Sequence, residues 1–265
     1  MLSGMNEGPL RLRRITDPST GRALLLSFTA GVQVGRVAGM EDLAAMVGSL
    51  GSTGHLTGAV VHAGVLDSLF ARFPDLACGV IVDLFGGTWL RAEMGTEQIC
   101  SLEHAVRVGA DAVLTTVSLG ARDESRTLRL SGQIARECQE WGMPLVVLID
   151  TFQTEAARQY SATLSGHGAR LAYELGADMV IVNYPGQPKP FADAVQGVCI
   201  PVLIGGAPRM ETDAAMLQSV EEAIKAGASG ACLPGTLFWK DDAPMATLSP
   251  LIHVITRDGK SRSSK

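Results

Sequence analysis

Ala172-Tyr-Glu-Leu-Gly-Ala-Asp-Met-Val180 is one of three similar stretches that decide the fold of this chain. The other two are Ala105-Val-Arg-Val-Gly-Ala-Asp-Ala-Val113 and Ala223-Ile-Lys-Ala-Gly-Ala-Ser-Gly-Ala231. Each begins like the last turns of an amphipathic helix, continues through Gly-Ala and an Asp or Ser, and ends in apolar or small residues. This pattern is typical of a helix closed by a glycine, a tight loop and a buried parallel strand.

Eight short apolar runs bounded by turn residues are strand candidates. They are Ala23–Thr29, Gly58–His62, Gly79–Leu84, Ala112–Ser118, Leu145–Asp150, Met179–Tyr184, Val202–Gly206 and Gly230–Pro234. Helical periodicity fills most of the segments between them, as in Met40–Leu50, Gln98–Val108, Leu128–Trp141, Glu155–Leu175 and Glu211–Ala226.

Eight alternating units in 265 residues predict an α/β protein with a single (β/α)8 TIM-barrel domain. We expect an N-terminal extension over about residues 1–20 and a disordered polar tail over about residues 258–265. A doubly wound open sheet is the alternative, although no Gly-x-Gly-x-x-Gly follows the first strand.

Composition narrows the class of protein further. The chain is 46% hydrophobic with a formal charge of −5, so we expect a large core and no nucleic-acid partner. Five dispersed cysteines without a Cys-x-x-Cys pair predict reduced thiols. No signal-peptide pattern and no apolar run near the roughly 18 residues of a membrane span occur, so we expect a cytoplasmic protein without a membrane partner.

In a TIM barrel, inward-facing residues at the C-terminal ends of the strands line the active-site mouth. Three titratable residues fall there and are the predicted catalytic set: His62, Asp83 and Asp150. They suit acid–base work or a divalent metal, but their spacing matches no metal motif, and we predict neither a metal nor a cofactor. The alternatives are that either Asp caps a helix or pairs with a loop arginine, and that His62 is a hydrogen-bonded core residue.

Further strand-end residues are predicted to bind the substrate. They are Thr29, Thr116, Ser118, Asn183, Tyr184, Gly205, Gly206, Gly235 and Thr236. Gly205-Gly206 and Gly235-Thr236 follow the last two strands, where barrels often bind phosphate through backbone N–H groups. The alternative is that these are simple turn glycines.

Several segments between about Leu24 and Leu251 resemble one known family. They include Gly58-Ala-Val-Val-His-Ala-Gly64, Ile134-Ala-Arg-Glu-Cys-Gln-Glu-Trp-Gly-Met-Pro-Leu145 and Val202-Leu-Ile-Gly-Gly206. The chain is similar to the archaeal-type (DhnA) class I fructose-bisphosphate aldolases, whose relatives include the LsrF thiolase and the aminodideoxyheptulosonate synthases. The resemblance implies a TIM barrel, a carbonyl substrate that carries phosphate in some members, and a homo-oligomer.

The resemblance also implies a Schiff base on a strand-6 lysine, and here the sequence departs from the family. Ile181 stands at the lysine position in Ala177-Asp-Met-Val-Ile181. Other family positions hold Thr29, Thr116, Asp150 and Thr236 in place of the usual residues. Isoleucine cannot form an imine, because an amine nucleophile is required. The remaining lysines are Lys189, Lys225, Lys240, Lys260 and Lys265.

Three functions follow as hypotheses. The first is a divergent lyase of the aldolase family that makes or breaks a carbon–carbon bond, or moves a proton, next to a carbonyl by acid–base catalysis, in a specialised biosynthetic pathway. The second keeps the Schiff base on a relocated lysine, Lys189 or Lys240. The third is a non-catalytic barrel that binds a ligand or serves as a partner subunit.

Overall fold

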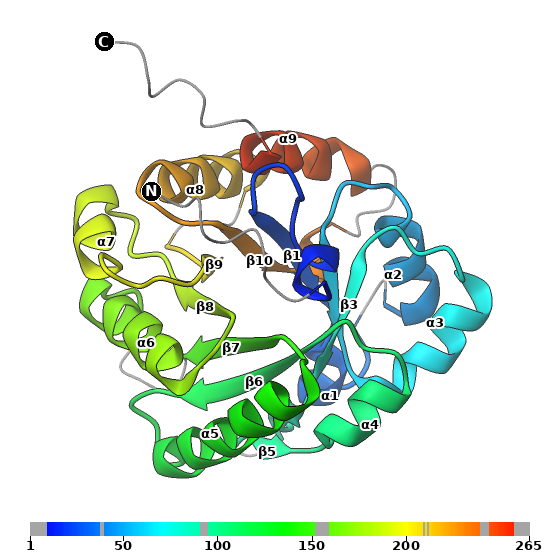
Figure 1. The fold of residues 1–265 in the computed structure, drawn as a ribbon. Helices are drawn as coiled ribbons and strands as arrows, with labels where there is room; N and C mark the ends of the chain where they lie inside the picture. Colours follow the sequence, from blue (N-terminus) through cyan, green and yellow to red (C-terminus); the bar gives the residue numbers. More distant parts are fainter. Residues whose placement is uncertain are drawn as a thin grey trace.

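The computed structural model describes residues 10–37, 40–90, 95–151, 159–208, 210, 212–238 and 244–256. Eight parallel strands close into a barrel in the order β1-β10-β9-β8-β7-β6-β3-β2 (Figure 1). The barrel strands are β1 (Ala23–Ser27), β2 (Gly58–Val61), β3 (Gly79–Asp83), β6 (Ala112–Ser118), β7 (Leu145–Asp150), β8 (Met179–Asn183), β9 (Val202–Gly206) and β10 (Gly230–Pro234). The predicted TIM barrel is confirmed, and the open-sheet alternative is wrong.

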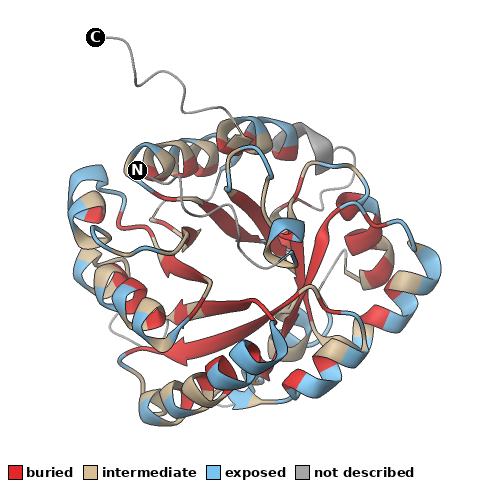
Figure 2. Cartoon of the chain, in the orientation of Figure 1, coloured by how far each residue is buried: buried red, intermediate tan, exposed pale blue. Residues whose placement is uncertain are grey.

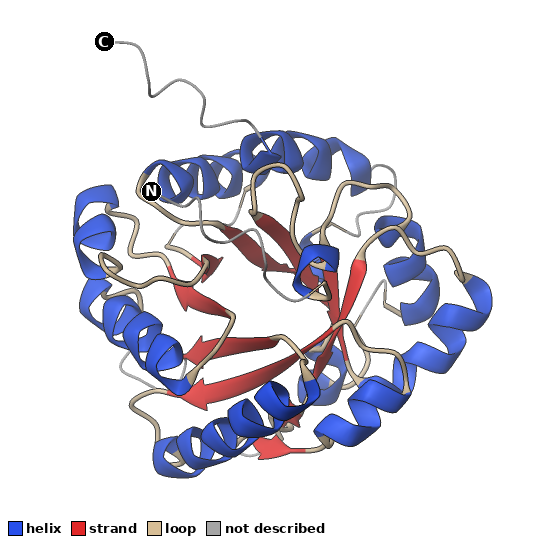
Figure 3. Cartoon of the chain, viewed as in Figure 1, coloured by secondary structure: helices blue, strands red, loops and turns tan. Residues whose placement is uncertain are grey.

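Helices surround the barrel in a ring (Figures 1 and 3). They are α1 (Ala30–Val34), α2 (Leu43–Gly51), α3 (Leu66–Arg72), α4 (Leu102–Arg107), α5 (Glu124–Trp141), α6 (Ala162–Leu175), α7 (Pro188–Ala194), α8 (Asp213–Lys225) and α9 (Pro244–Thr256). Short 3-10 turns occur at η1 (Leu12–Arg14), η2 (Ala63–Val65) and η3 (Gly235–Leu237). No helix within the described ranges is both long and apolar enough to cross a bilayer.

The three repeated stretches fold alike. Their glycines, Gly109, Gly176 and Gly227, have left-handed φ angles of 88°, 89° and 110°. In each case the following alanine donates its N–H to the carbonyl oxygen five residues earlier, at 2.9–3.1 Å. Two of the motif aspartates then bind the neighbouring strand, since Asp111 accepts the N–H of Val80 and Asp178 accepts that of Leu145. The motif therefore closes each helix and fixes where the next strand begins.

Helix boundaries account for most differences from the prediction. The segment predicted as a helix from Gln98 starts instead with β5 (Glu97–Gln98), which pairs antiparallel with β4 (Phe85–Gly86). The helix begins only after Ser101, whose hydroxyl oxygen accepts the N–H of His104 and caps α4. The predicted helix from Glu155 begins at Ala162 as α6, and residues 155–158 lie outside the described residues.

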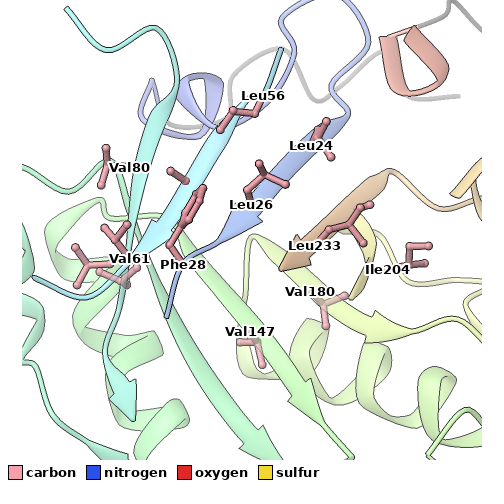
Figure 4. Packing of buried hydrophobic residues seen from close by; sticks show 14 of the residues in the cluster. Leu24, Leu26, Phe28, Leu56, Val61, Val80, Val147, Val180, Ile204 and Leu233 are labelled. Carbon is pink, nitrogen blue, oxygen red and sulfur yellow. The ribbon is translucent and has the colours of Figure 1, made fainter. Parts of the chain in front are cut away.

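Two apolar layers hold the molecule together, and Figure 2 shows them as buried strands inside a half-exposed helical ring. Side chains such as Leu24, Val61 and Val147 point outward and fill the space between strands and helices (Figure 4). A second cluster fills the barrel interior and contains Leu25 and Ile81. As in other TIM barrels, alternate strand residues therefore build two separate cores.

The N-terminal segment takes part in this interior. Residues 10–20, which belong to the predicted N-terminal extension, lead through η1 to Ile15, which is fully buried in the barrel interior. Ile15 lies against the backbone of Gly58 and Gly79, at the start of β2 and β3. The segment therefore covers the end of the barrel opposite the mouth. The predicted tail, 258–265, lies outside the described residues.

Candidate active site

A cavity of about 370 Å³ opens at the carboxyl ends of the barrel strands. This volume lies within the range of small-molecule sites, roughly 300–1,000 Å³. Six predicted site residues line it: Thr29, Asp83, Thr116, Asp150, Gly205 and Thr236. The structure therefore brings both predicted catalytic carboxylates to one cavity.

Asp83 is the more buried of the two carboxylates. It ends β3, is 8% exposed, and its Oδ1 accepts the N–H of Phe85 at 3.0 Å. Burial raises the pKa of Asp83 to about 7, because the hydrogen bond from Phe85, which lowers the pKa, offsets only part of the effect of burial. Near neutral pH a large share of Asp83 is therefore protonated, and the group can donate a proton as well as accept one.

Asp150 ends β7 nearer the solvent and is half-buried. In the strand register it lies beside Ser118 of β6, whereas Asp83 lies beside Leu114, four residues earlier on the same strand. The cavity therefore holds one carboxyl group deep in the barrel and a second one nearer the rim.

His62 does not line the cavity. Its Nδ1 lies 3.2 Å from the main-chain oxygen of Asp83, and the backbone of Thr29 forms a second hydrogen bond with the ring. Burial lowers the pKa of His62 more than these two hydrogen bonds raise it. The imidazole thus joins the ends of β1, β2 and β3 and matches the alternative of a hydrogen-bonded core histidine.

Three more predicted substrate-binding residues turn away from the cavity. Asn183 donates to the Oγ1 of Thr151 at 3.0 Å and to the main-chain oxygen of Gln159 at 3.2 Å. Tyr184 is fully buried and packs edge-on against Phe191, with ring centroids 5.3 Å apart. Ser118 is 1% exposed, and its hydroxyl has no hydrogen-bond partner among the described residues. None of these three lines the cavity.

The glycines predicted to bind phosphate have packing roles. A Cβ at Gly205 would lie 2.8 Å from the Cγ2 of Ile181, and a Cβ at Gly235 would lie 2.3 Å from the ring of Phe28. A Cβ at Gly206 would likewise lie 3.2 Å from the Oδ1 of Asn183. Gly206 and Gly235 do not line the cavity, so Thr236 and Gly205 are the members of this set that reach it.

Ile181 lies on the floor of the cavity. It is 1% exposed and sits beside Leu148 in the register of β7 and β8. None of the described residues that line the cavity is a lysine. Lys189 and Lys225 lie on the outer helices α7 and α8, where they pair with Asp193 and Glu221, and Lys240 lies outside the described residues.

Several lining residues were missed in the sequence: Ser27, Gln33, Trp89, Thr96 and Cys232. Ser27 and Cys232 follow from strand alternation, because Ser27 lies two residues after the inward-facing Leu25 on β1, and Cys232 of β10 lies beside Leu25 in the register. Burial raises the pKa of Cys232 to about 12, and the Asp83 carboxylate adds to this effect, so the thiol stays protonated. Trp89 and Thr96 belong to the loop after β3, which carries no periodic signal.

All five cysteines are free thiols. Among the described residues, no group of three His, Cys, Asp or Glu side chains is arranged to hold a metal ion. The chemistry that the described cavity offers is accordingly that of two carboxyl groups, a thiol, hydroxyls and an amide.

An eight-stranded barrel with a cavity at the carboxyl ends of its strands defines the class of TIM-barrel proteins. Within that class, the chain belongs to the DeoC/LacD family aldolases, whose sequence model matches residues 23–235. The predicted resemblance to class I aldolases is confirmed at this level.

Individual relatives agree with the family. A 2-amino-4,5-dihydroxy-6-oxo-7-(phosphonooxy)heptanoate synthase of Streptomyces griseus is 28% identical over 257 residues, 96% of this chain and 93% of that protein. The class 1 fructose-bisphosphate aldolase of Thermoproteus tenax is 28% identical over 229 residues, 84% of this chain and 86% of that protein.

Solved structures extend the similarity to three dimensions. An archaeal fructose 1,6-bisphosphate aldolase superimposes with a TM-score of 0.78 and 26% identity, covering 94% of this chain and 99% of that one. Another structure of such an aldolase, with a TM-score of 0.78, 25% identity and the same coverage, holds its catalytic Lys covalently bound to the carbinolamine intermediate.

Proposed function

We propose that this protein makes or breaks a carbon–carbon bond next to a carbonyl group by acid–base catalysis, without a Schiff base. The observation that carries the proposal is the buried Asp83 carboxyl group, which shares one cavity with Asp150 while Ile181 occupies the floor. Family membership supports the aldolase type of bond chemistry. Similarity to the Streptomyces griseus synthase supports a role in a specialised biosynthetic pathway.

The two carboxyl groups divide the work. Neutral Asp83 donates its proton to the carbonyl oxygen, while the carboxylate of Asp150 removes a proton from the neighbouring carbon, which gives an enol. The enol carbon then attacks the carbonyl carbon of an aldehyde. The enol O–H returns its proton to Asp83 and the new alkoxide takes the proton from Asp150, so both groups regain their starting states. The reverse sequence cleaves the bond.

Hydroxyl and amide groups around the carboxylates suit a hydroxylated carbonyl compound. Thr29 and Thr116, from the predicted set, line the cavity together with Thr236 and Gln33. These groups can orient hydroxyls and carbonyl oxygens without forming covalent bonds to them. Homo-oligomer formation and a cytoplasmic location stay predictions, as does a phosphate group on the carbonyl substrate.

The two other functions have less support. A relocated Schiff base would need an amine in the cavity, and Lys189 instead pairs with Asp193, with 84% of its side chain exposed. A non-catalytic barrel has no need of a buried, protonatable carboxyl group in an open cavity, because burying an ionisable group costs stability. Perturbed carboxyl groups in a cleft are more typical of catalytic sites.

Proton exchange tests the proposal without knowledge of the natural substrate. The protein is incubated with hydroxyacetone in D2O, and NMR follows deuterium entering the carbons next to the carbonyl. We expect exchange by the natural protein and a loss of about 10²–10⁴-fold in Asp83→Asn and in Asp150→Asn, the usual contribution of an acid or base. Lys189→Ala is the control and should exchange at the natural rate.

Borohydride added to the same samples separates the mechanisms, because it converts an imine into a stable amine whose added mass is measurable. The natural protein should gain no mass, whereas Ile181→Lys, with an amine on the floor, serves as the positive control. A mass gain on a lysine of the natural protein would overturn the acid–base mechanism. Equal exchange by the natural protein and both Asp variants would overturn the roles of the carboxylates.

A further inference from the structure

One side of the cavity floor is an aliphatic wall made of Leu114, Leu148 and Ile181. These residues lie on the neighbouring strands β6, β7 and β8 and all line the cavity. Leu114 is 3% exposed and Ile181 1% exposed, and in the register Leu148 lies beside Ile181 while Leu114 lies beside Asp83. A ligand group held by Asp83 therefore has an apolar surface next to it.

Side chains pack beside two of the glycines that were predicted to bind phosphate. The Cγ2 of Ile181 occupies the space above Gly205, and the ring of Phe28 occupies the space above Gly235. Gly235 is itself buried. Side chains therefore take up the space beside two of the predicted phosphate glycines, and of this set only Gly205 and Thr236 reach the cavity.

Asp83 also limits what the floor accepts. The carboxyl group is 8% exposed and its Oδ1 already accepts the N–H of Phe85. A phosphate beside it would be poorly solvated, and none of the described lining residues is a Lys, Arg or His that could balance its charge. A hydroxyl group against the aliphatic wall would lose its hydrogen bonds to water without gaining others there.

We propose that the floor side of the reacting carbonyl carries a methyl or other short alkyl group, so that the substrate class is an alkyl ketone, and that Ile181 determines this specificity. The inference rests on the proposed function, because it assigns the group bonded to the carbonyl carbon on which Asp83 acts. The carbonyl oxygen faces Asp83, the alkyl group contacts the aliphatic wall, and the polar remainder of the substrate extends to Thr29 and Asp150.

Hydroxyacetone and dihydroxyacetone form a matched pair of probes, since they differ by one hydroxyl group on one side of the carbonyl. Their dissociation constants are measured by ligand-observed NMR with the full chain, beside the deuterium-exchange assay. We expect hydroxyacetone to bind at least about tenfold more tightly, the usual effect of one buried hydroxyl that lacks a partner. Ile181→Thr, which matches Ile181→Val in shape but adds a hydroxyl to the wall, should reduce this preference, and Ile181→Val should keep it.

The outcomes separate the inference from the proposed function. A methyl preference that Ile181→Thr reduces supports the inference, even if neither ketone exchanges protons and the catalytic proposal fails. Equal or tighter binding of dihydroxyacetone overturns the inference, even if proton exchange depends on Asp83 as proposed. A methyl preference unchanged in Ile181→Thr overturns the role of Ile181, and binding of neither ketone overturns the inference as a whole.

Discussion

Asp83 is the residue on which the proposed chemistry depends, and its raised pKa follows from its position. A carboxyl group at the inward-facing end of β3 loses contact with water, and a single backbone N–H from Phe85 replaces it. Two or three such hydrogen bonds would hold a carboxyl pKa low, but one does not offset the burial. The fold thus keeps a proton on an acid that would be ionised in water.

The raised pKa of Asp83 predicts how stability changes with pH. The folded-state pKa of about 7 exceeds the ordinary value of 3.8, so the folded protein binds an extra proton between these values and loses stability as pH rises through them. Asp83→Asn removes this loss. Its free energy of unfolding relative to that of the natural protein should therefore be greater at pH 8 than at pH 5, by up to a few kcal/mol at about 1.4 kcal/mol per pKa unit, and its relative melting temperature should rise accordingly.

Thermal unfolding at the two pH values checks this prediction. Asp67→Asn, on the exposed face of α3, is the matched control. Its melting temperature should differ from that of the natural protein by the same amount at both pH values. A difference between Asp83→Asn and the natural protein that does not change with pH would mean that Asp83 is ionised throughout the range.

At the scale of elements, the β4–β5 ribbon forms one wall of the mouth, and α5 holds it. Arg126 of α5 donates to the main-chain oxygen of Thr96 at 2.5 Å and pairs with Glu97. Asp123, just before the helix, accepts the N–H of Thr96 at 2.9 Å. Because Thr96 lines the cavity, these contacts set the position of that wall.

Removal of the Arg126 side chain should loosen the β4–β5 ribbon. In Arg126→Ala, we expect amide hydrogen exchange over residues 95–98 to speed up by about tenfold or more, since a hydrogen bond to a charged group contributes roughly 1.5–3 kcal/mol. Arg170→Ala is the control, because Arg170 pairs with Glu174 on its own helix α6. Unchanged exchange at 95–98 in Arg126→Ala would show that the ribbon is held by other contacts.

The elements also show what sequence alone could predict. The three Gly-Ala stretches marked helix ends and strand starts correctly, because their glycines need left-handed φ angles and the aspartates in two of them bind the neighbouring, preceding strand. The ribbon could not be predicted, since two-residue strands carry no period. Asp83 and Asp150, the last residues of their strands, line the cavity, whereas His62 and Tyr184 lie one residue beyond β2 and β8 and do not line it. Beyond a strand end the alternation of side chains no longer applies, and His62 contacts the backbone of Asp83 while Tyr184 packs against Phe191.

At the scale of the whole molecule, the barrel is closed at one end and open at the other. Ile15 fills the end opposite the mouth and is fully buried in the barrel interior. The interior cluster of aliphatic side chains continues from there to Ile181 on the cavity floor. The N-terminal segment and the cavity floor therefore belong to one apolar cluster.

Truncation of Ile15 tests how much the N-terminal segment contributes to this apolar cluster. Ile15→Ala should lower the free energy of unfolding by about 2–5 kcal/mol, the usual cost of a large cavity in a core. Leu10→Ala, five residues earlier at 80% exposure, is the control and should change it by less than about 0.5 kcal/mol. Chemical denaturation measures both, and equal small effects would mean that residues 10–15 do not contribute to the core.

The proton on Asp83 is the central claim, and its pKa can be measured directly. The Cγ carbon of Asp83 in 13C-labelled protein changes its NMR shift on ionisation, and the Asp83→Asn spectrum identifies its signal. We predict a titration midpoint near 7, as burial of this carboxyl group requires. A midpoint near 4 would mean that Asp83 is ionised at neutral pH, and the acid–base mechanism would then lack its acid.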